Sequence, residues 1–241
     1  MPVTPGNKDV AEDAGLGRWL GHNAWRFFVL FVGVLLPLGA FVTLANEIHA
    51  METPWRDIAL LWRMRALTSP ELDALFVVVS KIGYQWGVIP LDVLVVLVLL
   101  LRRRWRRSIF AASAFIGSAL LNIGAKNLFQ RERPGLWESI APESTFSFPS
   151  GHAMGSMTLA VTLVMLAWRT RWRWPVLVLA AAFVLAVGMS RMYLGVHYPS
   201  DILAGWCAAL AWVLGVYLLL FGRRHRPRDN RQNDRARSEN S

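Results

Sequence analysis

A short polar stretch, Ser190 to Asp201, lies between two long apolar runs of the chain. It contains a guanidinium, an imidazole and a carboxylate, in Arg191, His197 and Asp201. Ionisable side chains are expensive in lipid and are usually kept there for function. Because His197 and Asp201 are four positions apart, a helical turn would let the carboxylate reach the imidazole and set its tautomer. A histidine oriented in this way can act as a base or a nucleophile, and Arg191 offers a planar fork of donors that suits phosphate oxygens.

The composition places these groups in a membrane protein. Of 241 residues, 54% are hydrophobic and 17% are charged, which is too apolar for an ordinary soluble domain. We predict an all-α integral membrane bundle of six transmembrane helices, with short interfacial helices on the extracytoplasmic side. The predicted spans are residues 27–45, 84–101, 108–125, 151–168, 174–190 and 202–221. The membrane domain, 27–221, then includes an interfacial segment at 47–81 and lies between an N-terminal tail, 1–26, and a basic disordered tail, 222–241.

The interfacial segment contains a clear helix start. Ser69 is a capping residue, Pro70 suits the first turn, and Glu71 lies near the positive end of the helix dipole. Apolar residues then recur at helical spacing along one face. This pattern indicates a short helix lying along the lipid headgroups, placed to cover the entrance to a site.

Three further features of the sequence are interpreted as structural. Asp92, the one acid well inside an apolar segment, is expected to pair with a neighbouring backbone or basic group. Ser113 and Gly117 lie four apart among alanines, so the span 108–125 is expected to pack closely against its neighbours. Cys207 is the only cysteine, which excludes an intrachain disulfide and a cysteine-based zinc site.

The distribution of positive charge orients the bundle. The formal net charge is +10, and 18 of the 26 Lys and Arg residues lie in the two tails and in residues 102–107 and 169–173. All four segments fall on one side of a six-span topology. By the positive-inside rule this side is the cytoplasm, and both termini lie there. Topology therefore explains the basic composition, and we expect no nucleic-acid partner.

The same topology brings three polar clusters to the opposite side. They are Lys126 with Arg133, Ser150 to His152, and Arg191 to Asp201. Three cations without enough acids to neutralise them favour an anion with several oxygens, and phosphate fits this description. Ser150 and Gly151 precede a helix, whose free N–H groups and positive dipole end also bind phosphate.

Two histidines supply the two proton-handling roles that phosphate ester cleavage needs. His197, oriented by Asp201, can attack phosphorus in line, while His152 can donate a proton to the leaving oxygen. The cations stabilise the charge that spreads over the equatorial oxygens in the transition state. The sequence contains no acidic cluster suited to magnesium or zinc, so we expect chemistry without a metal or other cofactor.

Together the clusters resemble the signature of the type 2 phosphatidic acid phosphatase superfamily. They read K-x6-R-P over 126–134, P-S-G-H over 149–152 and S-R-x5-H-x3-D over 190–201, in the order of that signature. The resemblance covers residues 70 to 221 and implies that His197 forms a phosphohistidine, that Asp201 orients it, and that His152 is the acid. The residues it implies for phosphate binding are Lys126, Arg133, Ser150, Gly151 and Arg191. Because the superfamily includes bacterial lipid phosphatases, it also implies an inner-membrane enzyme whose site faces outward, among membrane lipids.

Three functions follow from these patterns. The favoured one is a membrane phosphatase that hydrolyses a phosphomonoester or diphosphate of a lipid such as phosphatidate, phosphatidylglycerol phosphate or undecaprenyl diphosphate. Lipid-to-lipid phosphotransfer would use the same motifs, whereas a phosphate-binding lipid transporter is disfavoured because no inverted repeat is evident. Substrate choice is expected to depend on residues 47–90 and 135–148, with Glu138 and Glu143 as candidates. Arg131, between two motif cations, is expected only to extend to the membrane interface.

Overall fold

The structure, a computed structural model, describes residues 24, 27–50 and 55–222, and every regular element in this part of the chain is helical. The predicted all-α bundle is therefore confirmed. The two predicted tails, 1–26 and 222–241, fall outside the described residues apart from Ala24 and Gly222.

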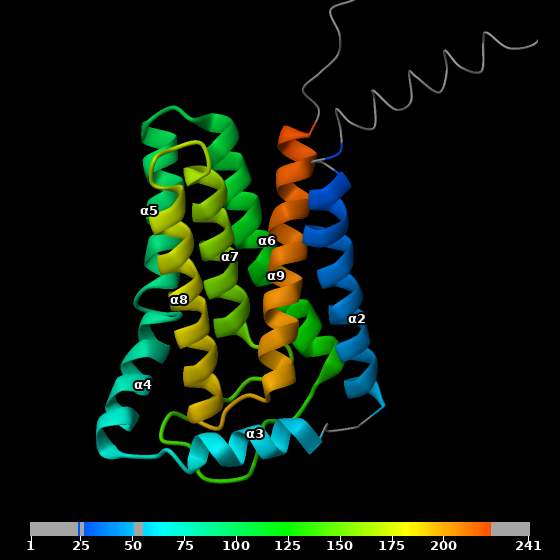
Figure 1. Ribbon diagram of the computed structural model, residues 1–241, viewed down its shortest axis with the longest axis vertical. Helices are drawn as coiled ribbons and strands as arrows, with labels where there is room; N and C mark the ends of the chain where they lie inside the picture. Colours follow the sequence, from blue (N-terminus) through cyan, green and yellow to red (C-terminus); the bar gives the residue numbers. More distant parts are fainter. Residues whose placement is uncertain (1–23, 25–26, 51–54, 223–241) are drawn as a thin grey trace, which may run out of the picture.

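Four of the described helices are long and apolar enough to cross a membrane. They are the continuous helix Phe27–Ile48, which contains η1 (Phe31–Leu35) and most of α2 (Leu36–His49), and α6 (Trp105–Phe129), α8 (Arg173–Tyr193) and α9 (Pro199–Phe221). Two shorter apolar helices, α5 (Val88–Leu101) and α7 (Gly151–Ala167), complete the bundle (Figure 1). These six helices occupy the regions where the sequence predicts six spans.

The helix α5 is shorter than the predicted span 84–101, because residues 84–87 form a turn before it. Its 14 residues extend about 21 Å at the usual rise, against about 30 Å for a hydrocarbon core. Figure 1 shows α4 (Pro70–Ile82) continuing below α5 along the same edge of the bundle, so the two helices together match the longer ones. Within α5, the buried Oδ1 of Asp92 has no hydrogen-bond partner among the described residues, so the expected pairing is not found.

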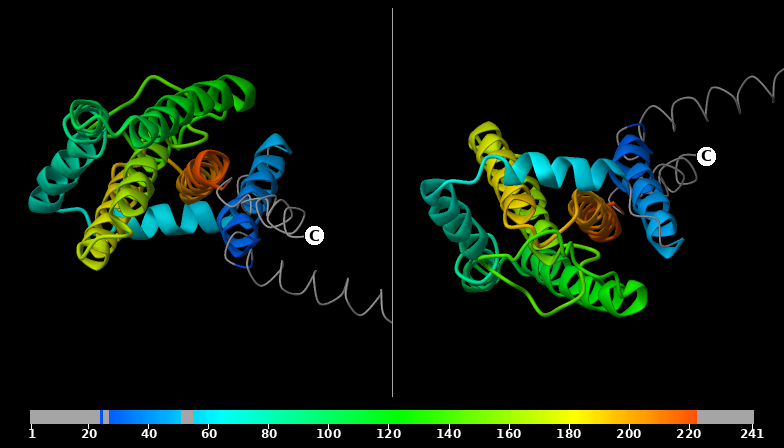
Figure 2. Two further views of the ribbon diagram at one scale, coloured as in Figure 1. Left: turned by 90° about the horizontal axis from the view of Figure 1, so that it is seen from above. Right: turned by 90° about the horizontal axis from the view of Figure 1, so that it is seen from below.

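The interfacial segment contains two helices with different orientations. The helix α3 (Trp55–Arg65) lies across the end of the bundle (Figures 1 and 2). The helix α4 begins as predicted, since the Ser69 side chain caps the Leu72 backbone N–H. It does not lie across the bundle, however. It runs beside α8, and the Tyr193 hydroxyl donates a 2.6 Å hydrogen bond to Asp73 in its first turn. The expectation of a helix lying along the headgroups therefore fits α3 and is wrong for α4.

Small residues bring α7 and α9 into close contact near the start of both helices. A Cβ atom at Gly205 of α9 would lie 2.9 Å from the Ser150 carbonyl oxygen, so only glycine fits there without a shift. The Ser150 backbone N–H donates to the Asp201 carbonyl at 3.1 Å. The end of the bundle that carries Ser150 and Asp201 is therefore one tightly packed unit.

The small residues of α6 accept a tryptophan from α9. The Trp212 indole N–H donates to the Ser113 and Ala114 carbonyls, each at 3.2 Å, and its ring covers Gly117. A Cβ atom at Gly117 would lie 2.1 Å from this ring. The predicted close packing of this span is confirmed, and its physical basis is the space that glycine leaves for an indole.

We predict that Gly117→Ala destabilises the protein by about 1–3 kcal/mol, because Trp212 must shift and its indole hydrogen bonds weaken. Gly124→Ala is the matched control on the same helix, since an added Cβ there meets nothing within 4 Å. Thermal unfolding in one detergent should show a lower Tm for the first variant and little change for the second. Equal behaviour of the two would contradict this account of the α6–α9 contact.

Candidate active site

The three polar motifs meet at the end of the bundle that α3 covers. Lys126 lies near the end of α6, Arg133 follows in the loop 130–150, and Ser150 and Gly151 begin α7. Arg191 lies in the last turn of α8. The histidine His197 lies in the short connection between α8 and α9, and His152 in the first turn of α7. Alternating helix directions thus deliver every predicted site residue to one end.

The His197 imidazole is fully buried between a carboxylate and a guanidinium. Its Nδ1 lies 3.4 Å from the Asp201 carboxylate and 3.3 Å from the Ser147 hydroxyl. Its Nε2 lies 3.2 Å from Nη1 of Arg133. Arginine can only donate, so this network assigns the ring proton to Nδ1 and leaves a lone pair on Nε2. That lone pair points to the side where the cations gather.

Asp201 is the most heavily bonded carboxylate of the site. It accepts hydrogen bonds from the Arg131 guanidinium at 2.5 Å, from the Tyr198 backbone N–H at 2.9 Å, and from the Ser147 hydroxyl. With His197 on a further side, its position is fixed by several groups from different parts of the chain. Asp201 can therefore orient the imidazole without moving itself.

The expectation that Arg131 extends to the membrane interface is wrong. Its guanidinium is buried, lies 3.9 Å from the centre of the Tyr198 ring, and donates to Asp201 and to the Ser200 hydroxyl. Asp57 of α3 accepts hydrogen bonds from the backbone N–H and the hydroxyl of Ser200, and lies 3.5 Å from Arg131. These contacts of Asp57, Arg131 and Ser200 connect α3 to the start of α9.

Arg133 is positioned by the loop in which it lies. It donates to the Thr145 carbonyl and to the Val196 carbonyl, each at 2.7 Å. Lys126 donates to the Thr145 hydroxyl at 2.9 Å and to the Phe146 carbonyl. Both cations line a cavity of about 480 Å³ between α6 and the loop. The side chains of Lys126 and Arg133 therefore face a space that an anionic group can enter.

The start of α7 adds backbone donors to this cationic region. The Ser150 side chain caps the Ala153 N–H, and the first backbone N–H groups of a helix have no partner within it. A Cβ atom at Gly151 would lie 3.2 Å from Oδ1 of Asn122, so glycine lets the Asn122 side chain lie close to the start of α7. The His152 ring stacks on Tyr84, with ring centres 4.9 Å apart. Tyr84 therefore helps to fix the plane of the second imidazole.

The carboxylate of Glu143 lies at the point where the cations and imidazoles converge. One oxygen accepts from Arg191 and lies 3.6 Å from Nδ1 of His152. The other accepts from Arg133 at 2.8 Å and lies 3.9 Å from Nε2 of His197. The two histidine rings thus approach one anionic group from different sides.

The charges of the site act on its two titratable loop residues. Burial lowers the pKa of His197 most, and the hydrogen bond to Asp201 opposes this, so that the pKa is about 4. Burial alone would raise the pKa of Glu143, but Arg191, the two histidines and Arg133 lower it to about 2. At neutral pH the site therefore contains a neutral His197 and an ionised Glu143.

Several residues of this site were not predicted from the sequence as members of it. They are Asp57, Tyr84, Asn122, Arg131 and Ser147. Asn122 lies four positions before Lys126 on α6, a helical spacing that places both side chains on one face. For Ser147 and Arg131 the one available signal was position, because both lie within a few residues of motif positions.

Known proteins resemble this chain in sequence. Residues 107–225 match the model of the PAP2 superfamily. Phosphatidylglycerophosphatase B of Bacillus subtilis is 29% identical over 175 residues, which cover 70% of this chain and 86% of that protein. An undecaprenyl-diphosphatase of Sulfolobus acidocaldarius is 31% identical over 147 residues, which cover 59% of this chain and 67% of that protein.

A solved structure resembles the whole bundle. The crystal structure of a transmembrane PAP2-type phosphatidylglycerolphosphate phosphatase from Bacillus subtilis superposes with a TM-score of 0.66 at 26% sequence identity. The match covers 78% of this chain and 98% of that one. The likeness therefore extends well beyond the three motifs.

We predict that acidification destabilises the wild type more steeply than His197→Gln. The folded state keeps His197 neutral to about pH 4, whereas the unfolded chain binds a proton near pH 6.5. The contribution of the neutral ring to the free energy of unfolding is therefore fully present above pH 6.5. This contribution falls by up to about 3 kcal/mol as the pH drops towards 4.

The measurement is Tm in detergent between pH 7.5 and 4.5 for both proteins. The glutamine variant keeps a polar side chain of similar size but has no proton to take up in this range. Parallel acid losses in the two proteins would show that another group is responsible.

Proposed function

The chain belongs to the PAP2 superfamily, and we propose that this phosphatase hydrolyses the phosphomonoester or diphosphate of a membrane lipid through a phosphohistidine on His197. The observation that carries the proposal is the placement of Glu143. An anionic group already lies between Arg133 and Arg191 and within 4 Å of both histidines. A substrate phosphate has the same sign of charge and the same need for bidentate donors.

In the first proposed step, the Nε2 lone pair of His197 attacks phosphorus. The negative charge of the bound substrate favours the protonated form of His152. The new N–P bond forms as the bond between phosphorus and the leaving oxygen breaks, and protonated His152 gives its proton to that oxygen. Asp201 accepts the Nδ1 hydrogen bond throughout and stabilises the positive charge that develops on the ring.

In the second step, water attacks the phosphohistidine. His152, now neutral, takes a proton from this water, the N–P bond breaks with its electrons returning to Nε2, and inorganic phosphate leaves. Lys126, Arg133 and Arg191, with Ser150 and Gly151 at the start of α7, are proposed to bind the phosphate oxygens in both steps. These cations take the part that metal ions have in other phosphoryl-transfer sites.

The location of the site suits a substrate that stays in the bilayer. The apolar helices support a multi-pass membrane protein, and the motifs lie at the end opposite to the arginines of residues 102–107 and 169–173. By the positive-inside rule we propose that this end faces outward and that both termini are cytoplasmic. Relatives named as a phosphatidylglycerophosphatase and an undecaprenyl-diphosphatase support a lipid monoester or diphosphate as the substrate class.

Glu143 must leave its position before a phosphate can bind. Its side chain is about one-quarter exposed and belongs to the loop 130–150. Of the two arginines that hold it, Arg191 belongs to the last turn of α8, and the Arg133 side chain is also fixed by the Thr145 and Val196 carbonyls. We propose that Glu143 neutralises the cations in the resting enzyme and competes with the substrate for them. The substrate then exchanges one set of charge-assisted hydrogen bonds for another.

We predict that His197→Ala abolishes phosphate release by the detergent-solubilised protein, with a loss of at least about a thousandfold, because no nucleophile remains. Radiolabelled phosphate from the substrate should be trapped on wild-type histidine after rapid acid-free denaturation and be absent from the variant. Chelator should leave wild-type activity unchanged.

Phosphatidate, phosphatidylglycerol phosphate and undecaprenyl diphosphate are the substrates to compare, with inorganic phosphate as the measured product. Unchanged activity in the folded alanine variant, or activity only with added metal, would contradict the mechanism. Transfer of phosphate to lipid in place of water would show a phosphotransferase.

We predict that Glu143→Gln strengthens inhibition by inorganic phosphate or vanadate by at least about tenfold, because the competing negative charge is gone. Glu138→Gln is the matched control, since Glu138 lies on the same loop and no ion pair joins it to a described residue of the site. The inhibition constants of the three proteins are the measurement. Weaker inhibition in the first variant would show that Glu143 organises the cations instead of competing for them.

A further inference from the structure

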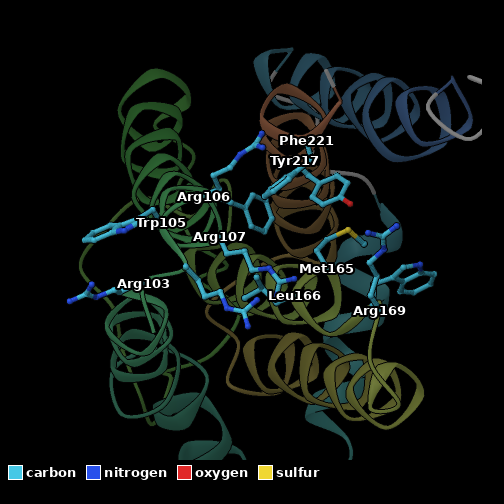
Figure 3. Close-up of a pocket in the computed structure, with 12 residues that line it drawn as sticks. Arg103, Trp105, Arg106, Arg107, Met165, Leu166, Arg169, Tyr217 and Phe221 are labelled. Carbon is cyan, nitrogen blue, oxygen red and sulfur yellow. The ribbon is translucent and has the colours of Figure 1, made fainter. Parts of the chain in front are cut away.

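The opposite end of the bundle contains a separate cavity of about 960 Å³. It lies between the start of α6, the end of α7 and the end of α9 (Figure 3). We call it the arginine crevice, because five arginines line it, namely Arg103, Arg104, Arg106, Arg107 and Arg169. None of the residues of the candidate active site lines this cavity.

The charge of the arginine crevice is not neutralised within the described part of the chain. No acidic residue is among its lining residues, and no described acid forms an ion pair with its arginines. Arg106 is used in packing, since it donates to the Leu220 carbonyl at 2.7 Å and lies 5.5 Å from the centre of the Phe221 ring. The other four arginines are exposed and available to an anion.

The inner walls of the crevice are apolar and aromatic. Phe110, Tyr217 and Phe221 form a cluster with ring centres 5.1 to 5.9 Å apart, and Met165 and Leu166 of α7 face it. Figure 3 shows Tyr217 and Phe221 next to Arg106 and across from Arg169. A ligand that fits both surfaces has an anionic group joined to an apolar part.

The turn between α5 and α6 positions two arginines of the crevice. The turn between α5 and α6 closes with hydrogen bonds from Arg103 N–H to the Leu100 carbonyl and from Arg104 N–H to the Leu99 carbonyl, each 2.8 Å. This pattern places Arg103 in the left-handed region, at a φ of 53°, where glycine is strongly favoured. This turn is a common way for a helix to end, and it brings Arg103 and Arg104 to the edge of the crevice.

We infer that the arginine crevice binds the headgroup of an anionic phospholipid from the cytoplasmic leaflet. Arg104, Arg107 and Arg169 pair with the phosphate oxygens, while the aromatic walls contact the glycerol and the first part of an acyl chain. A free phosphate would satisfy the cations but leave these walls uncovered. Residues 223–241 are an unsuitable occupant by charge, because they contain seven arginines and three acids.

The test compares two triple variants of the full-length protein. Arg104→Gln with Arg107→Gln and Arg169→Gln removes three arginines that line the crevice. Arg102→Gln with Arg171→Gln and Arg173→Gln removes three from the same end of the bundle that do not line it. Both variants lose the same charge, and both leave the proposed catalytic residues intact, so phosphate release from a lipid substrate serves as the check of folding.

Each delipidated protein is titrated in neutral detergent with dioleoyl phosphatidylglycerol, dioleoyl phosphatidylcholine or inorganic phosphate, and bound lipid is counted by native mass spectrometry. We expect the wild type to prefer phosphatidylglycerol over phosphatidylcholine. We expect the crevice variant to bind phosphatidylglycerol at least about tenfold more weakly and the control variant to stay within about threefold of wild type.

Equal losses in both triple variants would overturn the inference, because they would indicate diffuse attraction to a basic surface. Equal binding of the two lipids would overturn it as well. Competition by millimolar inorganic phosphate for the same arginines, with no lipid preference, would identify a soluble-anion site in place of a lipid site.

Discussion

Buried positive charge must be matched by negative charge, and this requirement organises the catalytic end of the bundle. Arg191 is almost completely buried, and most of the Arg131 and Arg133 side chains is buried as well. A cation without a partner in such a place would destabilise the fold by far more than ordinary hydrogen bonds can offset. Asp57 lies beside Arg131, and two carboxylates next to the histidines, Asp201 and Glu143, supply further matching charge. The stability of the fold therefore depends on an anion being present among these arginines.

The two carboxylates differ in how permanent their positions are. Asp201 is fully buried at the start of α9 and accepts from backbone and side chains of several segments, so its displacement would break the packing of the helix end. Glu143 lies on a loop and bonds only to side chains that a phosphate can also use. Its low pKa keeps Glu143 ionised, which suits a group that must be replaced by another anion. In the proposed mechanism, Asp201 orients the histidine and Glu143 exchanges with the substrate phosphate.

Motif spacing and helix periodicity predicted the elements that deliver the site, because both depend on regular geometry. Alternating helix directions bring Lys126 and Arg191 to one end although 65 positions separate them. The loop 130–150 has no period, so nearness to the motifs was the one signal for Arg131 and Ser147, and no pattern predicted their contacts with Asp201. The hydrophobic periodicity of α4 could not predict its orientation, because one apolar face packs equally well against a headgroup layer or a neighbouring helix.

Both ends of the bundle gather arginines, yet their surroundings give them different chemistry. At the end that carries the candidate active site the cations are buried beside two imidazoles, so a phosphate bound there would lie next to the proposed nucleophile. The lining of the arginine crevice contains no histidine, so a phosphate there would only be bound. Arg107 and Lys126 lie 19 residues apart on α6, about 28 Å along its axis, close to the thickness of a hydrocarbon core. A headgroup bound at Arg107 would therefore fix the depth of α6 in the bilayer and place Lys126 at the level where the opposite leaflet presents its phosphates.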